Sequence, residues 1–303
     1  MPTKTLSVII PTHNRQDALE KVLRGLERQS ALEEIQEVLV VDDGSTDDTP
    51  GTVSRISKTS PLRIRLLRQD QCGQAAARNR GLREAATNLV LFLDDDIIPR
   101  TNLVGGHLAW HRKYPDPGVS VMGPVFWSRE LRPTPFMEWF GDRGPFLNYR
   151  GLRLGSEVEP SRSYSCNISM KGTFLRRQGA FDEDFRAYGF EDLELAYRLK
   201  KAGGKLLYNP EAVGEHYKFI TFAAACKRAK QTALARELLD TKEAGAYFSQ
   251  LSHRTKKSAR YRIGNLLIKT VVPFLAPMKP LMDSHVPLPW PVYAAFYHYY
   301  KFR

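Results

Sequence analysis

The sequence predicts an α/β protein with a mostly parallel central sheet, followed by a basic and mainly helical extension. Short apolar runs alternate with segments in which leucine, valine or alanine recur at helical spacing. Polar side chains follow three of the first four apolar runs, and basic side chains accumulate after residue 216. Strands that read as continuous apolar runs are typical of a parallel sheet covered on both faces. We therefore expect helices on both sides of the sheet.

The first hundred residues carry the clearest alternation. We expect strands at 7–10, 37–41, 62–67 and 88–93, separated by helices at 17–30, 46–56 and 73–86. From 116 to 160 prolines, glycines and aromatic residues dominate, which favours loops and short helices rather than sheet. A helical region at 181–203, a short strand at 206–208 and basic helices from 217 to about 261 complete the expected order.

The bulk composition is that of an ordinary globular protein. The 303 residues are 42% hydrophobic and 26% charged. The three cysteines lie far apart and form no CxxC, so we expect neither a disulfide framework nor a zinc ribbon, but a reduced, cytosolic setting. The apolar run at 6–10 is too short for a signal peptide, and no segment approaches the ~20 apolar residues of a membrane-spanning helix.

The net charge of +12 is unevenly distributed. Residues 217–303 hold 15 basic and four acidic side chains, so this stretch alone carries +11. Such asymmetry indicates an anionic partner, either a membrane surface or a nucleic acid. No DNA- or RNA-binding motif accompanies the charge, which argues against nucleic acid.

Polar residues follow the first, second and fourth predicted strands. They are Thr12-His13-Asn14, Asp42-Asp43 and Asp94-Asp95-Asp96. In open parallel sheets ligands bind outside the carboxyl ends of the strands. Three adjacent carboxylates repel one another and need a cation or a proton, and carboxylate oxygens suit Mg²⁺ or Mn²⁺ bridging to a diphosphate. A solvated acidic turn is the alternative interpretation.

Three further features could contribute chemistry. Arg78, on the predicted helix 73–86, could neutralise a phosphate or pair with the aspartates. Glu191 and Asp192 lie in a helical segment, where one carboxylate could act as a general base. His216 follows a strand and would be a credible ligand beside a carboxylate-bound metal. Each feature alone also has an ordinary structural interpretation.

The order and spacing of these stretches carry more weight than any one of them. The chain resembles the family 2 glycosyltransferases, which have the GT-A (Rossmann-like) fold. The matching stretches span about residues 5–217 and are VIIPTHNR (8–15), VVDDGSTDDT (40–49), GQAAARNRGL (73–82), LFLDDD (91–96), SCNISMKGTFLRRQGAFDEDF (165–185), GFEDLELAYRL (189–199) and YNPEAVGEH (208–216).

This resemblance implies a nucleotide site at the first two strand ends. His13 and Asp43 would contact the base, Pro11 and Thr12 would shape the wall, and Arg78 would lie near the nucleotide or its phosphates. The implied donor is a nucleotide-diphosphate sugar, with UDP as the expected nucleotide and dTDP or GDP as open alternatives.

The resemblance also implies a site for Mn²⁺ or Mg²⁺. Asp94 and Asp96 correspond to the two acids of the family's DxD motif, with Asp96 the better candidate for the metal. Asp95 would help to position the ribose or the sugar, and His216 matches a metal-ligand histidine found in part of the family.

The catalytic assignments rest on the same resemblance. Asp192 matches the family's catalytic base, and Glu191 would hold hydroxyl groups of the acceptor or the donor sugar. Asn167 lies where the family often has Gly-x-Asn, but Ser165 replaces the glycine, which leaves its donor contact open. A single displacement by an acceptor hydroxyl implies inversion at the anomeric carbon.

We therefore expect a catalytic domain at 1–216, with a nucleotide-binding half at about 1–100 and an acceptor half at about 101–216. Residues 217–303 would form a basic helical and aromatic region that docks on anionic lipid at the cytoplasmic face, packs on the catalytic domain or makes an oligomer. The apolar side chains that favour docking are Leu266, Leu267, Ile268, Val271, Val272, Phe274, Leu275, Trp290, Tyr293, Phe296, Tyr297, Tyr299 and Tyr300.

The expected activity is transfer of the sugar to a saccharide or lipid-linked acceptor in cell-surface polysaccharide or glycolipid synthesis. Two other functions compete with it. No GxGxxG follows the first predicted strand, which argues against a dinucleotide-dependent enzyme. A catalytically silent nucleotide-sugar-binding or scaffold protein is the other alternative, and the intact acidic positions argue against it.

Overall fold

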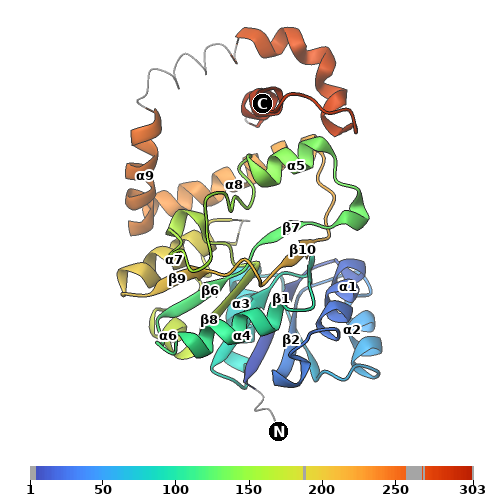
Figure 1. The fold of residues 1–303 in the computed structure, drawn as a ribbon, viewed down its shortest axis with the longest axis vertical. Helices are drawn as coiled ribbons and strands as arrows, with labels where there is room; N and C mark the ends of the chain where they lie inside the picture. Colours follow the sequence, from blue (N-terminus) through green and yellow to red (C-terminus); the bar gives the residue numbers. More distant parts are fainter. Residues whose placement is uncertain (1–4, 187–188, 257–267, 269, 302–303) are drawn as a thin grey trace. The chain divides into compact units, whose positions relative to one another are not determined.

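The computed structural model divides the chain into two compact units, each built from separate stretches of sequence. Figure 1 shows the chain coloured along its length, and the residues described here are 5–186, 189–256, 268 and 270–301. The first unit comprises residues 1–126, 151–186 and 191–218, and the second comprises 127–150, 187–190 and 219–303. The second unit therefore takes in two stretches that lie before the domain boundary expected at residue 216.

A seven-stranded mixed sheet forms the centre of the first unit (Figure 1). Its spatial order is β3-β2-β1-β4-β8-β6-β9, in which β3, β2, β1 and β4 are mutually parallel and β8 is antiparallel to both neighbours. β6 and β9 are again parallel. The strand bounds are β1 Leu6–Thr12, β2 Ile35–Asp43, β3 Ile64–Gln69, β4 Leu89–Leu93, β6 Val119–Met122, β8 Asn167–Lys171 and β9 Lys205–Tyr208.

The apolar runs of the sequence become buried strands. Every residue of β1 is buried, as are eight of the nine residues of β2. The helices are α1 Gln16–Leu26, α2 Thr49–Ser57, α3 Gln74–Glu84, α4 Leu103–Lys113, α6 Gly172–Arg177 and α7 Glu191–Lys201, with 3₁₀ turns at η1 Leu32–Glu34 and η3 Pro160–Arg162. α3 packs on β1 and β2 at Gly81, where an added Cβ would lie 2.4 Å from Ile9 Cγ2. The parallel half of the sheet and its helices thus match the predicted pattern.

A second, three-stranded sheet has the order β5-β10-β7. Its strands are β5 Ile97–Pro99, β10 Gly214–His216 and β7 Val125–Trp127. β5 and β10 pair antiparallel, with His216 opposite Ile97. This pairing brings residues from the end of the first unit next to the segment that follows β4.

Two expectations from sequence are wrong. The stretch 116–160 contains strands β6 and β7, and β6 lies inside the main sheet, between β8 and β9. β6 is only four residues long and follows a Pro-Gly turn, so its periodicity is too short to distinguish a strand from a loop. Of the helical region expected at 181–203, the described residues are helical only at Glu191–Lys201.

The second unit is helical and has an aromatic core. Its elements are α5 Pro135–Asp142, α8 Phe222–Thr241, α9 Glu243–Lys256, α11 Trp290–Tyr300 and the 3₁₀ segments η2 Arg129–Leu131 and η4 Val272–Asp283. Phe136 of α5 lies 5.5 Å from Phe222, and Trp139 lies 6.1 Å from Tyr293, measured between ring centroids. The core therefore joins α5 to the start of α8 and to α11, which are far apart in sequence.

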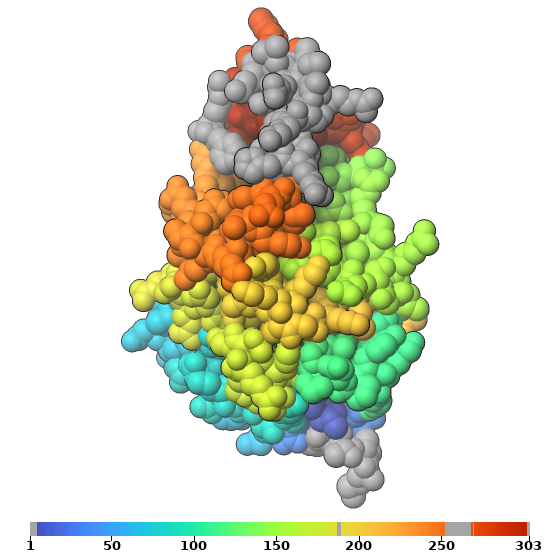
Figure 2. All heavy atoms as spheres, turned by 90° about the vertical axis from the view of Figure 1, so that its left-hand side faces the viewer, coloured from blue at the N-terminus to red at the C-terminus, as the bar shows by residue number. Residues whose placement is uncertain are grey.

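Some of the tail side chains expected to face a membrane are instead part of this core. Val272, Tyr293, Phe296 and Tyr297 are buried within the second unit, so membrane contact is the wrong assignment for them. Leu266 and Leu267 lie outside the described residues, and Figure 2 draws all residues outside the described ranges in grey. Within the described ranges, no helix has both the length and the apolar character needed to cross a bilayer.

Candidate functional site

The register of the main sheet brings three strand ends to one edge. Thr12 of β1 pairs with Asp42 of β2, and Ile9 of β1 pairs with Phe92 of β4. Counting three residues onward from Ile9 and Phe92 leads to Thr12 at the end of β1 and to Asp95 just after β4. β2 and β4 lie on opposite sides of β1, so the strand order reverses here, which is where open α/β sheets bind ligands.

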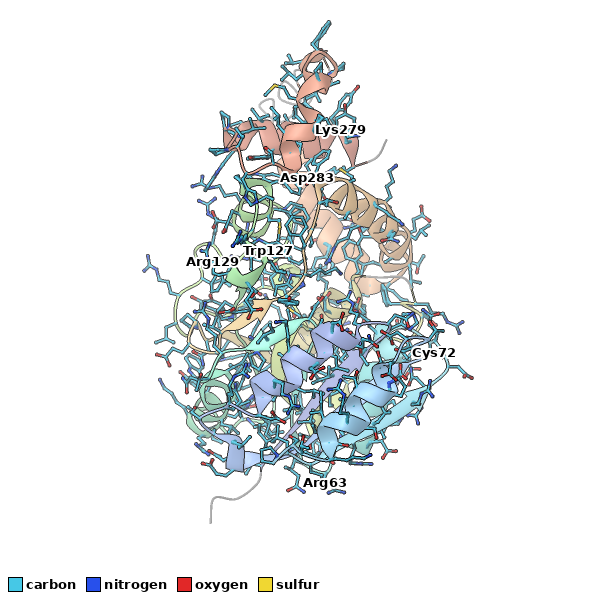
Figure 3. The ribbon with its side chains drawn as sticks, turned by 90° about the vertical axis from the view of Figure 1, so that its right-hand side faces the viewer. Arg63, Cys72, Trp127, Arg129, Lys279 and Asp283 are labelled. Carbon is cyan, nitrogen blue, oxygen red and sulfur yellow. The ribbon has the colours of Figure 1, made fainter. Side chains whose placement is uncertain are left out.

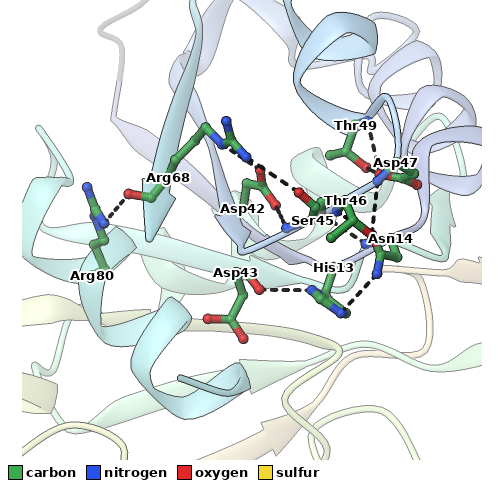
Figure 4. A network of polar contacts seen from close by, with 10 residues as sticks. All are labelled: His13, Asn14, Asp42, Asp43, Ser45, Thr46, Asp47, Thr49, Arg68 and Arg80. Atoms are coloured by element: carbon green, nitrogen blue, oxygen red, sulfur yellow. Dashed lines mark hydrogen bonds and ion pairs between the residues drawn. The ribbon is translucent and has the colours of Figure 1, made fainter. Parts of the chain in front are cut away.

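The loops after β1 and β2 are tied together by Asn14 (Figure 4). Its side-chain oxygen accepts hydrogen bonds from the backbone N–H groups of Thr46, at 2.7 Å, and Asp47, at 3.2 Å. The Asn14 N–H donates to the Ser45 hydroxyl at 2.9 Å. Asn14 has φ 53°, a left-handed conformation that asparagine tolerates better than most residues. The two loops therefore form one fixed wall beside the strand ends.

Asp43 holds the loop that leads into α3. Its carboxylate accepts from the backbone N–H groups of Cys72 and Gly73, both at 2.8 Å, and from Gln69 Nε2 at 2.8 Å. The backbone carbonyl of Asp43 lies 2.8 Å from His13 Nδ1 (Figure 4). The structure thus brings the two predicted base contacts together, next to buried Pro11 and Thr12. It also shows that the Asp43 carboxylate already supports the backbone.

Each member of the triple aspartate contacts at least one basic side chain. Asp94 accepts from Arg78 at 2.8 Å, and Asp95 accepts from Arg15 at 3.2 Å. Asp96 contacts both Arg15 and the imidazole of His216, whose Nε2 lies 3.3 Å from Asp96 Oδ2. The expected need for counter-charge is therefore met by two arginines, Arg15 in the loop after β1 and Arg78 of α3.

The same neighbours set the acidities of these groups. Burial raises the pKa of Asp95 to about 7, against the opposing effect of Arg15. Burial acts in the same direction on Asp96, but His216 and Arg15 outweigh it and hold the pKa of Asp96 well below its usual range. Asp96 is thus the carboxylate that stays charged, which is what a metal ligand requires.

The position of His216 follows from strand pairing. Antiparallel pairing of β10 with β5 sets His216 opposite Ile97, and the Tyr217 N–H donates to the Asp96 carbonyl at 2.7 Å. The histidine is buried and therefore has little freedom to leave Asp96. The structure brings Asp96 and His216 together, and their role as metal ligands stays a prediction.

Arg78 connects the acidic strand end to the start of α7. Its guanidinium is fully buried and donates to Asp94 at 2.8 Å and to Glu191 at 2.9 Å. Burial alone would lower the pKa of Arg78, but Asp94 and Glu191 outweigh it and raise the pKa above its usual value. Arg78 is therefore a permanently charged bridge, and it fixes the position of Glu191.

Asp192 follows Glu191 at the first turn of α7. The backbone of Ser165 forms a hydrogen bond with its carboxylate, and Cys166, the next residue, accepts from the Asp94 N–H at 3.1 Å. Burial, reinforced by the charge of Glu191, raises the pKa of Asp192 to about 7, with Arg78 opposing the shift. A carboxyl group with this pKa can accept a proton near neutral pH.

The backbone of Asn167 pairs with Leu93, next to Asp94, but its side chain is engaged inside the first unit. Its side chain is fully buried, donates to the Ala212 carbonyl at 2.8 Å and lies 2.9 Å from His107 Nε2. Both ends of the amide are therefore used inside the unit, and in this structure the residue supports the fold rather than facing a ligand. The expected donor contact of Asn167 has no support here.

Arg15 is the site residue that sequence reasoning missed. It follows the first predicted strand directly after Thr12-His13-Asn14, and it pairs with two of the three aspartates. The sequence did hold a clue to Arg15, because three acids at one strand end need cations, and a neighbouring strand end can supply them. Arginine side chains are long and flexible, however, so the sequence alone does not say which one supplies the charge.

Asp96 and His216 have the chemistry of a divalent-metal site. Carboxylate oxygen and imidazole nitrogen are donors that suit Mn²⁺, and oxygens of a diphosphate could complete the coordination. Asp94 is not part of this pair, because its carboxylate is turned to Arg78. Among the residues that the structure describes, no group of three acidic, histidine or cysteine side chains is arranged to hold a metal. The residues fit a metal site with two protein ligands better than one with three.

Replacing Arg15 with glutamine should make the chain bind Mn²⁺ more tightly, roughly tenfold or more. The guanidinium contacts both Asp95 and Asp96, so it competes with a divalent cation for the same carboxylates. Calorimetric titration with Mn²⁺ alone would measure the change. Arg24→Gln, on helix α1 just after Arg15 but paired with Glu27, should leave the affinity unchanged. Equal or weaker Mn²⁺ binding by Arg15→Gln would contradict the competition.

The sequence model of "Glycosyl transferase family 2" matches residues 7–185, which is more than half of the chain. The chain belongs to this family. The match covers the loops after β1, β2 and β4 and the strand β8, so it includes most of the site described above. The GT-A fold implied by the resemblance is confirmed by the structural relatives below.

Curated relatives extend the similarity beyond the matched segment. Validoxylamine A glucosyltransferase from Streptomyces hygroscopicus subsp. limoneus is 34% identical over 232 residues, covering 69% of this chain and 51% of the relative. Pre-mycofactocin glycosyltransferase from Mycobacterium tuberculosis is 31% identical and covers 70% of this chain and 43% of the relative. The chain thus spans about half the length of the curated relatives it matches.

Solved structures show the same fold at lower identity. Mannosyltransferase PcManGT from Pyrobaculum calidifontis, in complex with GDP-Man and Mn²⁺, has a TM-score of 0.59 and 21% identity. That similarity covers 100% of this chain and 90% of the other. S. aureus TarS 1–349 in complex with UDP has a TM-score of 0.57 and 17% identity, with 97% and 89% of the two chains covered.

Proposed function

We propose that this protein is an inverting glycosyltransferase that moves a sugar from a nucleotide-diphosphate sugar, with UDP as the expected nucleotide, to an acceptor hydroxyl. The observation that carries the proposal is the convergence of two acidic centres in one unit. Asp96 and His216 meet at 3.3 Å, and Asp192 lies beside Glu191, which Arg78 links to Asp94. The family membership and the metal and nucleotide ligands of the structural relatives support the same function.

Different residues of the site would bind different parts of the donor. The wall formed by His13, Asn14 and the 42–47 loop would receive the nucleotide. Asp96 and His216 would hold a divalent ion, which when bound would supply positive charge to offset the leaving diphosphate. Asp95, beside Asp96, would contact the ribose or the sugar. These assignments place the leaving group near the ends of β1 and β4.

Asp192 would act on the acceptor. Its raised pKa lets it accept the hydroxyl proton near neutral pH, as the acceptor oxygen attacks the anomeric carbon on the side opposite the diphosphate. Glu191, fixed by Arg78, would hold a sugar hydroxyl so that the reacting atoms are aligned. One displacement of this kind inverts the anomeric centre.

The broader role is a second part of the proposal. We propose a saccharide or lipid-linked acceptor in cell-surface polysaccharide or glycolipid synthesis, met at the cytoplasmic face of a membrane. The excess of basic side chains in 217–303 supports an anionic membrane surface as partner. The three cysteines are all free thiols, which supports a reduced setting.

A donor-hydrolysis assay tests the reaction class. EDTA should abolish release of the nucleoside diphosphate, and Mn²⁺ should restore it. Asp96→Asn should reduce release by about a hundredfold or more, because the charged metal ligand is lost, whereas Glu211→Gln, at an exposed acid of the same unit, should have no effect. A thermal-shift panel of UDP, GDP and dTDP sugars with Mn²⁺ would identify the donor. Donor binding without turnover in any acceptor mixture would favour a catalytically silent binding protein.

A further inference from the structure

Exposed apolar side chains are concentrated in one short segment of the second unit. Of the ten large hydrophobic side chains exposed in the described part of the chain, five lie between residues 271 and 290. Phe274 is 83% exposed and Val286 56% exposed, and the others are Val271, Leu281 and Trp290. Single exposed apolar residues are common, but a run of them in twenty residues marks an interaction surface.

This segment, 271–290, is fixed on the core from its inner side. Val272 and Met282, which neighbour exposed Val271 and Leu281, are buried against the aromatic cluster. The Asp283 carboxylate accepts from the Phe222 N–H at 2.6 Å and ties η4 to the start of α8. The exposed side chains therefore belong to a segment whose backbone is held in place by packing and by a hydrogen bond.

The backbone of the segment is unusually poor in hydrogen-bond donors. It contains five prolines, at positions 273, 277, 280, 287 and 289. Proline has no N–H, and an unsatisfied N–H is costly in an apolar environment. A chain that approaches lipid outside a regular α-helix therefore gains from proline at these positions.

The segment itself is formally neutral, but two basic side chains, Lys279 and Arg143, lie against aromatic rings at it. Its charged residues are Lys279 and Asp283, labelled in Figure 3, and Asp283 is occupied with the Phe222 N–H. The Arg143 guanidinium lies 3.5 Å from the centre of the Trp290 ring, and Lys279 Nζ lies 4.7 Å from the centre of the Tyr300 ring. Tryptophan and tyrosine with adjacent cations are typical of side chains at the lipid headgroup level.

We propose that the 271–290 segment is a membrane-docking edge, which inserts Phe274, Val286 and Trp290 among the lipids of an anionic bilayer. Lys279 and Arg143 would contact the headgroup phosphates while the apolar side chains lie at the acyl boundary. This inference deepens the proposed function, on which it rests for its lipid-linked acceptor. It replaces the broader aromatic stretch expected from sequence with a defined surface.

Vesicle flotation of the full chain tests this surface. The protein should float with vesicles of phosphatidylcholine and phosphatidylglycerol, and it should bind pure phosphatidylcholine more weakly. The double variant Phe274→Ser/Trp290→Ser should lower the partition coefficient by about tenfold or more, because two large apolar side chains lose their lipid contact. The matched control Leu154→Ser/Leu234→Ser, at two exposed leucines outside the segment, should bind like the unaltered chain.

Two further readouts separate the possible outcomes. Trp290 should shift its fluorescence to shorter wavelength on vesicle addition, and Trp290→Phe should remove that shift. Donor hydrolysis in the absence of lipid should be unchanged in the double variant, so loss of membrane binding and loss of the reaction are distinguishable. Absence of flotation with anionic vesicles would overturn the inference. So would unchanged lipid binding together with loss of a dimer in light scattering, which would assign the surface to a second copy of the chain.

Discussion

Asp192→Asn should reduce the turnover of sugar transfer by about 10²–10⁴-fold, the usual contribution of a general base. The amide keeps the size of the carboxylate and the contact with the Ser165 backbone, but it cannot accept the acceptor proton. Donor binding should be unchanged, because the nucleotide wall and Asp96 are untouched. Steady-state kinetics with the donor identified by thermal shift would measure the loss, with Glu211→Gln as an acid-to-amide control.

The pH dependence of the reaction should also reveal Asp192 as the general base. Because burial and Glu191 raise the pKa of Asp192 from 3.8 to about 7, the base is protonated below neutral pH. The rate should therefore fall as the pH falls through about 7, whereas an exposed aspartate would stay active down to about pH 4. The residual activity of Asp192→Asn should lack this fall in rate at acidic pH, which is the acidic limb of the pH profile. A limb retained in the variant would assign the proton transfer to another group.

Arg78→Met should destabilise the first unit by about 3–5 kcal/mol, the usual cost of removing one partner from a buried ionic network. The substitution preserves much of the side-chain volume but leaves buried Glu191 and partly buried Asp94 without their shared cation. Chemical denaturation would measure the change. Arg55→Met, at an exposed pair with Glu20, should leave the unfolding midpoint unaltered.

Arg78 should also influence the catalytic base. Its charge opposes the rise in the pKa of Asp192, so removing it should raise that pKa further and move the acidic limb to higher pH. Arg78→Lys keeps a positive charge but cannot make the same two-pronged contact, and it should be intermediate in both stability and pH profile. A fully stable Arg78→Met protein would show that the bridge between α3 and α7 is not needed for folding.

The parallel half of the fold could be predicted because its signals are local. β1, β2 and β4 are continuous apolar runs, and the polar residues after them meet because parallel strands end at one edge. The pairing of Asp96 with His216 spans 120 residues, and the resemblance to a family, rather than any local pattern, predicted it. Strand β6 was missed because it is four residues long and its partners β8 and β9 are distant in sequence.

Side-chain partners were the least predictable part of the site. Nothing in the sequence says that Arg15 serves Asp95 and Asp96 while Arg78 serves Asp94 and Glu191. Asn167 is a comparable case, because its position in a family motif suggested a ligand contact. Antiparallel pairing sets it opposite Leu93 in the sheet interior, where its amide is used by Ala212 and His107.

The discontinuous second unit has a consequence for how the chain matures during synthesis. Trp127, Phe136 and Trp139 leave the ribosome long before Tyr293 and Phe296, which share their cluster. Until helix α11 is released, these apolar side chains remain uncovered, and a nascent or prematurely terminated chain would expose them to chaperones or to neighbouring polypeptides. Helix α11 therefore completes the core of the second unit, and a fragment cut at residue 216 would be prone to aggregate.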